Sequence, residues 1–250
     1  TINQTGTRNV MEAAIAAGVE QVVHCSTESI LKSVKRSAQP EGKTDESVSL
    51  TLEDMAGAYC RGKFVAEQEA FAAAKKGLPV VIVNPTVPIG PGDRRITPPT
   101  RMMLGFLNGK YPAYLNSTLN LIDARDVALG HLLAAERGIP GERYILGNAN
   151  ITLGELLQRL ESVTGLPMPK RQIPYWLAYS VSALQEAVAD YITKSPPSAP
   201  LTGVKLARSP MTFDNSKAQQ QLGLSFRPLE ASLKDAVADY RQRGLLTRSA

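Results

Sequence analysis

Tyr59 and Lys63 stand four residues apart, and Thr27 precedes both in the chain. In a helix, residues four apart share a face, so the phenol and the ammonium would project together. A phenol has an ordinary pKa of about 10, and a neighbouring ammonium stabilises the phenolate and lowers that pKa. A hydroxyl such as that of Thr27 can orient a substrate oxygen and stabilise charge that develops on it. These residue types predict an acid/base centre for redox chemistry on a hydroxyl or carbonyl group.

The elements around this centre indicate an open α/β fold. Apolar residues at helical spacing over 5–17 end at Gly18, which suits a left-handed helix cap. The β-branched run over 19–27 predicts a buried parallel strand that ends at the threonine of the centre. A long helix is expected over 52–76 and a second buried strand over 78–84. This alternation predicts right-handed β-α-β crossovers in a parallel sheet, whose carboxyl edge is where such folds place ligands.

The chain changes character after Pro85, where Pro and Gly become frequent up to Pro99. Shorter helices and strands are expected beyond that loop, at 100–107, 120–122, 126–137 and 144–147. Thr152 and Glu155 form a T-x-x-E capping box for a further helix. The last third is mostly helical, with a Pro-rich break at 194–200.

These patterns divide the chain into two domains. Residues 1–150 are expected to form a partial dinucleotide-binding domain, with a substrate loop interleaved at 86–120. Residues 151–250 are expected to form a smaller, α-rich C-terminal substrate lobe.

Composition narrows the class of protein. The 250 residues are 43% hydrophobic and 20% charged, which is ordinary for a globular protein and argues against disorder. The net charge of +5 would suit a nucleic acid or an anionic nucleotide, but Lys and Arg are spread along the chain without a run of five, which favours a generic solvated surface.

The cysteines and histidines exclude two further kinds of site. Cys25 and Cys60 form no disulfide framework, and with His24 and His131 as the two histidines no metal site is expected. Neither a signal peptide nor an apolar stretch long enough to span a bilayer is evident, so the cytoplasm is the expected compartment.

Several segments match, in order, the motifs of one protein family. They are Asn3-x-x-Gly6-Thr7-x-Asn9, Cys25-Ser26-Thr27, Tyr59-Cys60-Arg61-Gly62-Lys63-Phe64, Asn84 to Asp93 (NPTVPIGPGD), Asp126-Val127-Ala128, Gly141 to Gly147 (GERYILG), and Ser216-Lys217-Ala218 with Leu222-Gly223. The chain thereby resembles the extended short-chain dehydrogenases/reductases of the NAD-dependent epimerase/dehydratase type. More narrowly, it resembles the dihydroflavonol-reductase-like proteins and the hopanoid-associated sugar epimerases.

The resemblance implies a Rossmann-type doubly wound parallel sheet and a set of roles. Tyr59 would be the general acid/base, Lys63 its activator and a contact to the ribose, and Thr27 would stand where the family usually has Ser. The implied activity is NAD(P)-dependent oxidoreduction or epimerisation of a sugar nucleotide or of a ketone or alcohol.

Further residues are implied at the cofactor, which would be NAD or NADP. Pro85, Thr86 and Val87 would touch its nicotinamide end, Lys63 its ribose, and Asn3 would lie near the active site.

Two departures from the family pattern stand out. Gly62 replaces a common Ser. Because glycine is more flexible, it lowers the stability of a helix by about 0.5–1 kcal/mol relative to Ala. No Gly-rich strand-to-helix turn precedes Asn3, so the sheet is expected to lack its N-terminal strands and to leave an unpaired edge at 19–27. We therefore interpret the chain as an N-terminally truncated fragment that binds dinucleotide poorly or not at all.

Alternatives to an enzyme remain open at this point. A non-catalytic relative that senses a nucleotide or scaffolds a partner is the second hypothesis, and a basic nucleic-acid binder is the third. A homodimer through the helices near 5–17 and 52–76 is plausible by resemblance, although their alanines would pack equally well inside one monomer. Arg94, Arg95 and Arg101 are candidates to meet a substrate phosphate, or else are solvated loop residues.

Overall fold

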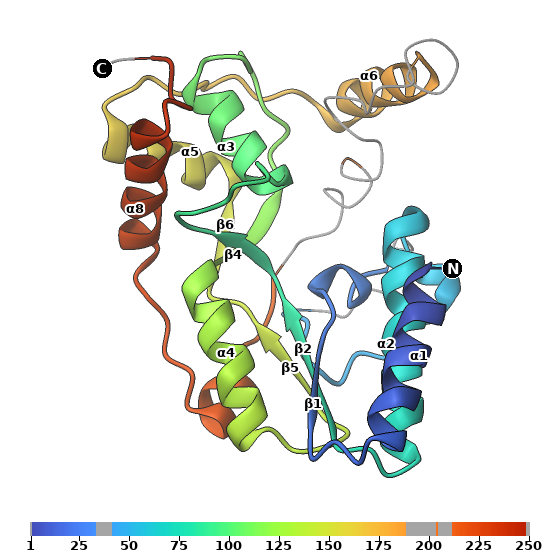
Figure 1. Ribbon diagram of the computed structural model, residues 1–250. Coiled ribbons are helices and arrows are strands. Elements are labelled where there is room, and N and C mark those ends of the chain that lie inside the picture. Colours follow the sequence, from blue (N-terminus) through green and yellow to red (C-terminus); the bar gives the residue numbers. More distant parts are fainter. Residues whose placement is uncertain (1, 34–41, 189–203, 205–211, 249–250) are drawn as a thin grey trace. The chain divides into compact units, whose positions relative to one another are not determined.

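The computed structural model describes residues 2–33, 42–188, 204 and 212–248 (Figure 1). The chain divides into two compact units. The first unit comprises Thr1–Pro88, Asn120–Ala149 and Thr212–Arg227, and the second comprises Ile89–Leu119, Asn150–Met211 and Pro228–Ala250.

A parallel sheet of three strands organises the first unit. Its strands are β1 (Val22–Cys25), β2 (Val80–Pro85) and β5 (Arg143–Leu146), in the order β1-β2-β5. Val23 of β1 pairs with Val81 of β2, and Val83 of β2 pairs with Tyr144 of β5. The expected α/β fold with a parallel sheet is confirmed.

Helices cover both faces of this sheet, as Figure 1 shows, with α1 and α2 on one side and α4 on the other. Because successive strand residues point to opposite faces, the apolar run Val80–Val83 of β2 contributes side chains to two hydrophobic cores, one on each face of the sheet. Val80 and Ile82 pack with residues of α1 (Ile2–Ala16) and α2 (Gly57–Lys75).

On the opposite face, Val81 and Val83 pack with Leu133 of α4 (Ala124–Arg137) and with residues of η5 (Ala218–Leu222), a short π-helical segment. The apolar run that predicted a strand buried on both faces is therefore explained by a helical layer on each side.

Several boundaries differ from those expected. The helix expected over 52–76 is two elements, the 3-10 turn η3 (Leu52–Asp54) and α2, separated by extended backbone at Met55 and Ala56. Gly57 then adopts φ of +67°, a left-handed conformation that favours glycine. A second 3-10 turn, η1 (Glu28–Ile30), follows shortly after β1.

A second sheet has the order β3-β4-β6, from β3 (Val87–Ile89), β4 (Thr118–Asp123) and β6 (Ala149–Thr152). The divisions between the two units fall at or within these strands. Of the three, only β4 was expected, because β3 and β6 are short and lie in Pro/Gly-rich or polar sequence.

The second unit is mainly helical. Its helices are α3 (Pro98–Leu107), α5 (Leu153–Thr164), α6 (Tyr175–Val188) and α8 (Leu229–Gln242). The Thr152–Glu155 capping box is confirmed at the start of α5. Residues 212–227, which we expected in the C-terminal lobe, group with the first unit. The Pro-rich break at 194–200 lies outside the described residues.

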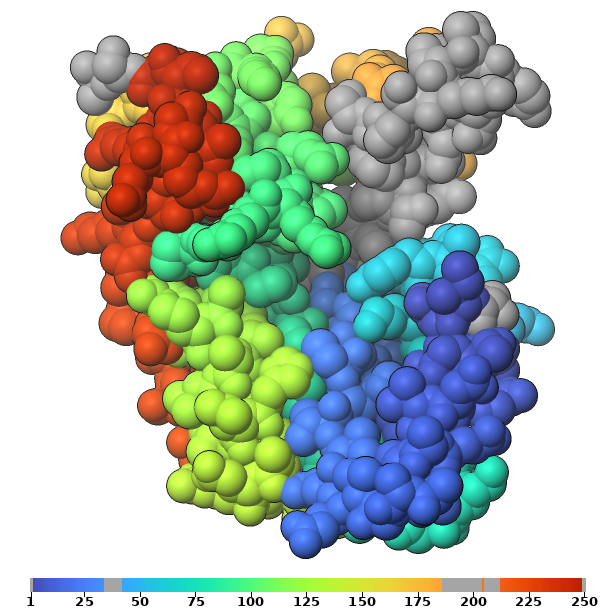
Figure 2. Space-filling model, viewed as in Figure 1, coloured from blue at the N-terminus to red at the C-terminus, as the bar shows by residue number. Residues whose placement is uncertain are grey.

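The alanines of α1 and α2 behave differently from one another. Ala66, Ala70 and Ala73 of α2 are buried, and the last two pack against Met11 and Ala14 of α1 within the chain. On the outer side of α1, Ala13 is exposed and Val10 is 61% exposed, and Ala17 just beyond the helix is exposed too. This helix forms part of the surface shown in blue in Figure 2. Within the described part of the chain, no helix has the length and apolarity needed to cross a bilayer.

Candidate active site

Thr27 lies just beyond the carboxyl end of β1. Its backbone is extended, and its side chain caps η1 by accepting a hydrogen bond from the Ser29 amide. The neighbouring Ser26 amide donates to the Val83 carbonyl over 2.8 Å, which continues the β1-β2 ladder to this point. Thr27 is only 7% exposed, so its hydroxyl has a fixed set of partners.

Tyr59 lies in the first turn of α2 and is 57% exposed. Loss of solvation raises the pKa of its phenol, hydrogen bonding from Thr27 acts in the opposite direction, and the charge of Glu28 raises the pKa further. The net direction is upward. The expectation of a lowered pKa for Tyr59 is therefore wrong for this structure.

Lys63 lies one turn after Tyr59 on α2, and its ammonium donates to the carbonyl oxygen of Cys25 over 3.2 Å. It therefore reaches the carboxyl end of β1, the same strand end that carries Thr27. Burial and the charge of Lys63 together lower the pKa of His24 to about 4. The three residues selected from sequence thus meet at one strand end.

The residues expected at the cofactor lie at the neighbouring strand end. Pro85 closes β2, and Val87, half-buried, begins β3. Thr86 between them is buried, and its amide (2.9 Å) and hydroxyl (3.3 Å) both donate to the Leu146 carbonyl. The hydroxyl therefore links the end of β2 to the end of β5. Asn3 of α1 lies against α2, where a Cβ added to Gly62 would come within 3.0 Å of the Asn3 amide nitrogen.

Two buried carboxylates near Thr27 were not selected from the sequence. Glu28 accepts a hydrogen bond from the Thr27 hydroxyl over 2.9 Å. Glu67 accepts from the Asn84 amide over 2.8 Å, and the same amide donates to the Thr27 carbonyl over 3.2 Å. The sequence around Glu28 and Glu67 does not set them apart from surface glutamates. Their burial, which the structure shows, is what makes them unusual.

Arg94, Arg95 and Arg101 are exposed residues of the second unit. The guanidinium of Arg101 donates to the Ile96 carbonyl over 3.3 Å. Nothing in this arrangement selects a phosphate ligand for them.

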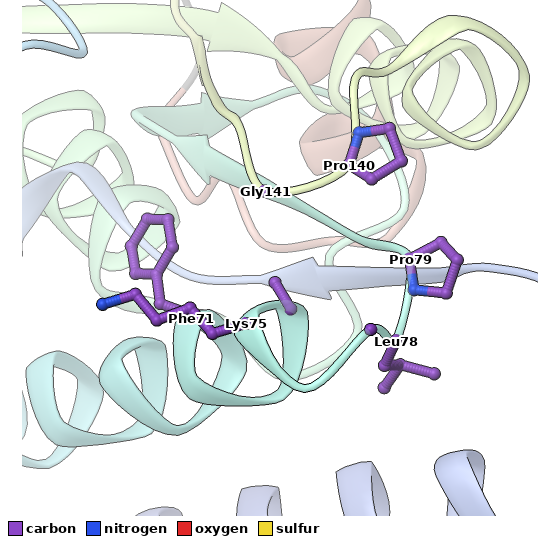
Figure 3. Close-up of a pocket in the computed structure, with 8 residues that line it drawn as sticks. Phe71, Lys75, Leu78, Pro79, Pro140 and Gly141 are labelled. Carbon is purple, nitrogen blue, oxygen red and sulfur yellow. The ribbon is translucent and has the colours of Figure 1, made fainter.

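A cavity of about 390 Å³ lies at the other end of the first sheet (Figure 3). Leu78 and Pro79 precede β2 and Pro140 and Gly141 precede β5, so the cavity adjoins the amino ends of these strands. Open parallel sheets bind ligands at the carboxyl ends, and the cavity therefore does not mark the candidate site.

Comparison with known proteins places this arrangement in a family. Residues 1–147 match the model of the NAD dependent epimerase/dehydratase family. A Synechocystis protein that carries the name dihydroflavonol 4-reductase is 44% identical over 97% of this chain and 70% of its own length. Sterol demethylase protein B of Methylococcus capsulatus is 32% identical over 98% of this chain and 74% of its own length.

Solved structures agree with this assignment. The crystal structure of gox2253 is 35% identical, with a TM-score of 0.83 over 98% of this chain and 73% of that one. A nucleoside-diphosphate-sugar epimerase from Pseudomonas aeruginosa, 23% identical, shares the fold with a TM-score of 0.79 over 99% of this chain and 76% of its own. The chain therefore belongs to the NAD dependent epimerase/dehydratase family, a family of enzymes that use NAD or NADP.

Proposed function

We propose that Tyr59, Lys63 and Thr27 form the acid/base centre of an NAD(P)-dependent enzyme that reduces a carbonyl group or epimerises a hydroxyl-bearing carbon. The observation that carries the proposal is the convergence of the three side chains at the carboxyl end of β1. A surface Tyr–Lys pair on a helix has no reason to meet a buried, capping hydroxyl at a strand end.

The donors at this edge fit the ribose–nicotinamide end of the cofactor. The ammonium of Lys63 has three donors, and its hydrogen bond to Cys25 uses one of them. The other two suit ribose hydroxyls, while Pro85, Thr86 and Val87 would border the nicotinamide and Asn3 would lie close by. When bound, the cofactor supplies hydride transfer.

Tyr59 would donate its proton to the substrate oxygen during reduction and recover it during oxidation. Its raised pKa keeps the phenol protonated at neutral pH, which suits the donor role in the reductive direction. Thr27 would hold the same substrate oxygen and stabilise its charge. Lys63 would position the ribose beside the phenol.

Reduction of a ketone is the direction that we favour. The relative with 44% identity is named as a reductase, and cinnamoyl-CoA reductase 2 of Medicago truncatula is 30% identical over 96% of this chain. Epimerisation of a sugar nucleotide is the variant supported by shared fold, since the sugar epimerase is only 23% identical.

A non-catalytic relative that binds a nucleotide without turnover is the second candidate. It is favoured by the partners that Thr27 already has in Glu28 and Ser29, which can serve a purely structural cap. The two candidates differ in the effect of removing the Tyr59 phenol oxygen, which abolishes turnover only if Tyr59 is the acid/base.

The test compares Tyr59→Phe with the unchanged protein, both expressed from the full gene, following cofactor oxidation with a panel of ketones and nucleotide sugars. We expect turnover to fall by about 10²–10⁴-fold while cofactor affinity, measured by NADPH fluorescence, stays the same. Tyr179→Phe on α6, also an exposed tyrosine, is the matched control and should leave the rate unchanged. Full turnover by Tyr59→Phe would refute the proposal, and cofactor binding without any turnover by the unchanged protein would favour the non-catalytic candidate.

We also propose a homodimer through the outer sides of α1 and α2. Val10 and Ile15 are exposed on α1 beside the small residues Ala13 and Ala17, an arrangement that permits close helix packing. Sedimentation equilibrium should show a dimer that Val10→Glu dissociates. A monomer at all concentrations would contradict it.

A further inference from the structure

The carboxyl group of Glu28 is enclosed beside the hydroxyl of Thr27. Glu28 is 7% exposed, and its Oε2 lies 2.9 Å from Thr27 Oγ1. Burial raises the pKa of Glu28, while the Thr27 hydrogen bond and the positive charge of Lys32 act against this rise. Burial therefore favours the neutral acid more than it would at an exposed glutamate, and a neutral acid can donate a hydrogen bond where a carboxylate cannot.

The hydroxyl of Thr27 has one proton to donate and two lone pairs to accept with. The Ser29 amide donates to one lone pair over 3.3 Å, and Ser29 Oγ lies 2.9 Å away, where either hydroxyl can be the donor. If Glu28 is a carboxylate, it takes the Thr27 proton. If Glu28 is neutral, it donates to the second lone pair, and the Thr27 proton turns away from Glu28, either to Ser29 Oγ or toward Tyr59.

We propose that Glu28 is a positioning residue which, as a neutral acid, directs the Thr27 proton toward the Tyr59 oxygen and the substrate oxygen. When Glu28 ionises, it withdraws that proton and leaves Thr27 able only to accept. The proposal rests on the proposed function, in which Tyr59 is the acid/base. It adds a residue whose protonation state sets the direction of the hydrogen bonds around that acid/base.

Other titratable groups face Glu28 and enter the same equilibrium. Lys32, on its own segment, is 1% exposed, and burial lowers the pKa of Lys32 to about 8. From α2, Tyr59 and Cys60 both respond to Glu28, whose negative charge raises the pKa of each. Glu28 thus acts on Tyr59 twice, through its charge and through the Thr27 proton.

The first test needs no turnover. Tyrosine labelled with carbon-13 at Cζ reports the phenol titration by NMR, and Tyr59→Phe assigns the signal. Glu28→Gln should lower the pKa of Tyr59 by about one unit, because the amide carries no charge and can donate to Thr27. Glu28→Ala should lower it less, because it removes the charge without supplying a donor.

A second background separates the two effects. With Thr27→Val present, only the charge effect remains, so Glu28→Gln and Glu28→Ala should give the same Tyr59 pKa. Glu20→Gln, which changes an exposed carboxylate, is the control and should leave Tyr59 unchanged. An unchanged Tyr59 titration in Glu28→Gln, or an equal shift from Gln and Ala while Thr27 is intact, would overturn the proposal.

The pH profile of kcat/KM gives the kinetic test. In the unchanged protein the rate should fall as pH rises through the pKa of Glu28. In Glu28→Gln this fall should vanish while the rate at low pH is retained, and Glu28→Ala should be about tenfold slower at low pH. A profile that Glu28→Gln leaves unaltered would show a merely structural carboxyl. Retained activity of Tyr59→Phe would instead refute the proposed function, and the NMR coupling would still decide the role of Glu28.

Discussion

Asn84 donates a hydrogen bond from its side-chain amide to the main-chain carbonyl of Thr27 over 3.2 Å. The same nitrogen donates to the Glu67 carboxylate over 2.8 Å. Asn84 is fully buried near the end of β2, so one amide ties together the ends of β1 and β2 and a helix that packs on them. The position of Thr27 depends on this side chain.

Removal of that amide should destabilise the protein. In Asn84→Ala, the Thr27 carbonyl and the Glu67 carboxylate each lose a buried donor, which we expect to lower the free energy of unfolding by about 2–3 kcal/mol. Urea denaturation followed by circular dichroism measures the loss. Asn84→Asp should be worse, because it places a second carboxylate beside Glu67. A loss below about 0.5 kcal/mol for Asn84→Ala would mean that water replaces the donor.

Arg143 is expected to matter more than an ordinary surface arginine. Its guanidinium donates to the Glu67 carboxylate over 3.2 Å, to the Glu46 carbonyl over 2.9 Å and to the Val48 carbonyl. Arg143→Met leaves the Glu67 charge buried, and we expect a loss of about 3–5 kcal/mol in unfolding free energy.

The double variant Glu67→Gln/Arg143→Met removes the charge as well and should be less destabilised than Arg143→Met alone. Arg143→Lys is the matched control, since it keeps the charge but cannot reach three acceptors at once. Equal stability of the single and double variants would show that Glu67 does not depend on its ion pair.

His24 should make the fold sensitive to acid. Burial lowers the pKa of His24 to about 4 from its ordinary 6.5, so its contribution to stability is present above pH 6.5 and is lost as pH falls toward 4. The loss amounts to about 3 kcal/mol at most. In His24→Gln, the free energy of unfolding should depend less on pH in this window. Urea denaturation at intervals of about one pH unit between pH 7 and 4 measures it.

His131 supplies a control of opposite sign. A hydrogen bond with Cys25 raises the pKa of His131, so its contribution is present at low pH and is lost as pH rises through that pKa. His131→Gln should therefore steepen, not flatten, the acid side of the profile. Identical profiles for both variants would contradict the assignment to His24.

Two helical glycines should respond to alanine in opposite ways. A Cβ on Gly130 of α4 would lie 2.8 Å from a methyl carbon of Leu146, which is fully buried and cannot move aside. Overpacking there should outweigh the gain in helix propensity, and we expect a net loss of about 1–2 kcal/mol. A Cβ on Gly62 would meet only the exposed Asn3 side chain, so Gly62→Ala should be neutral or stabilising by up to about 1 kcal/mol. Urea denaturation gives the free energy of unfolding of both variants. A Gly130→Ala variant that is more stable than the unchanged protein would refute the packing argument.

The hydroxyl of Thr27 should matter through its proton, not its shape. Thr27→Ser keeps the hydroxyl and should retain kcat within a few-fold, whereas Thr27→Val keeps the shape and should lose about 10²-fold. Steady-state kinetics with the best ketone substrate compares them. If Thr27→Val is as active as Thr27→Ser, the residue serves only to cap η1.

Local sequence was sufficient for a large part of this protein. The run Val80–Val83 is apolar at every position, which is typical of a strand covered on both faces. Tyr59 and Lys63 share a helix face because of their spacing, and Thr152 caps α5 because Glu155 follows three residues later. Each of these features depends on residues within a turn or two of one another, so the sequence alone could determine it.

The remainder depends on contacts between distant residues. Asn84 and Thr27 are 57 residues apart, and Arg143 and Glu67 are 76 apart, so no local pattern marks either pair. The spacing predicted a lowered pKa for Tyr59, whereas loss of solvation and the charge of Glu28 raise it in spite of the hydrogen bond from Thr27. Sequence predicted that Thr27, Tyr59 and Lys63 stand near one strand end, and tertiary structure alone decided that Glu28 and Glu67 are buried beside them, because burial depends on contacts between distant segments.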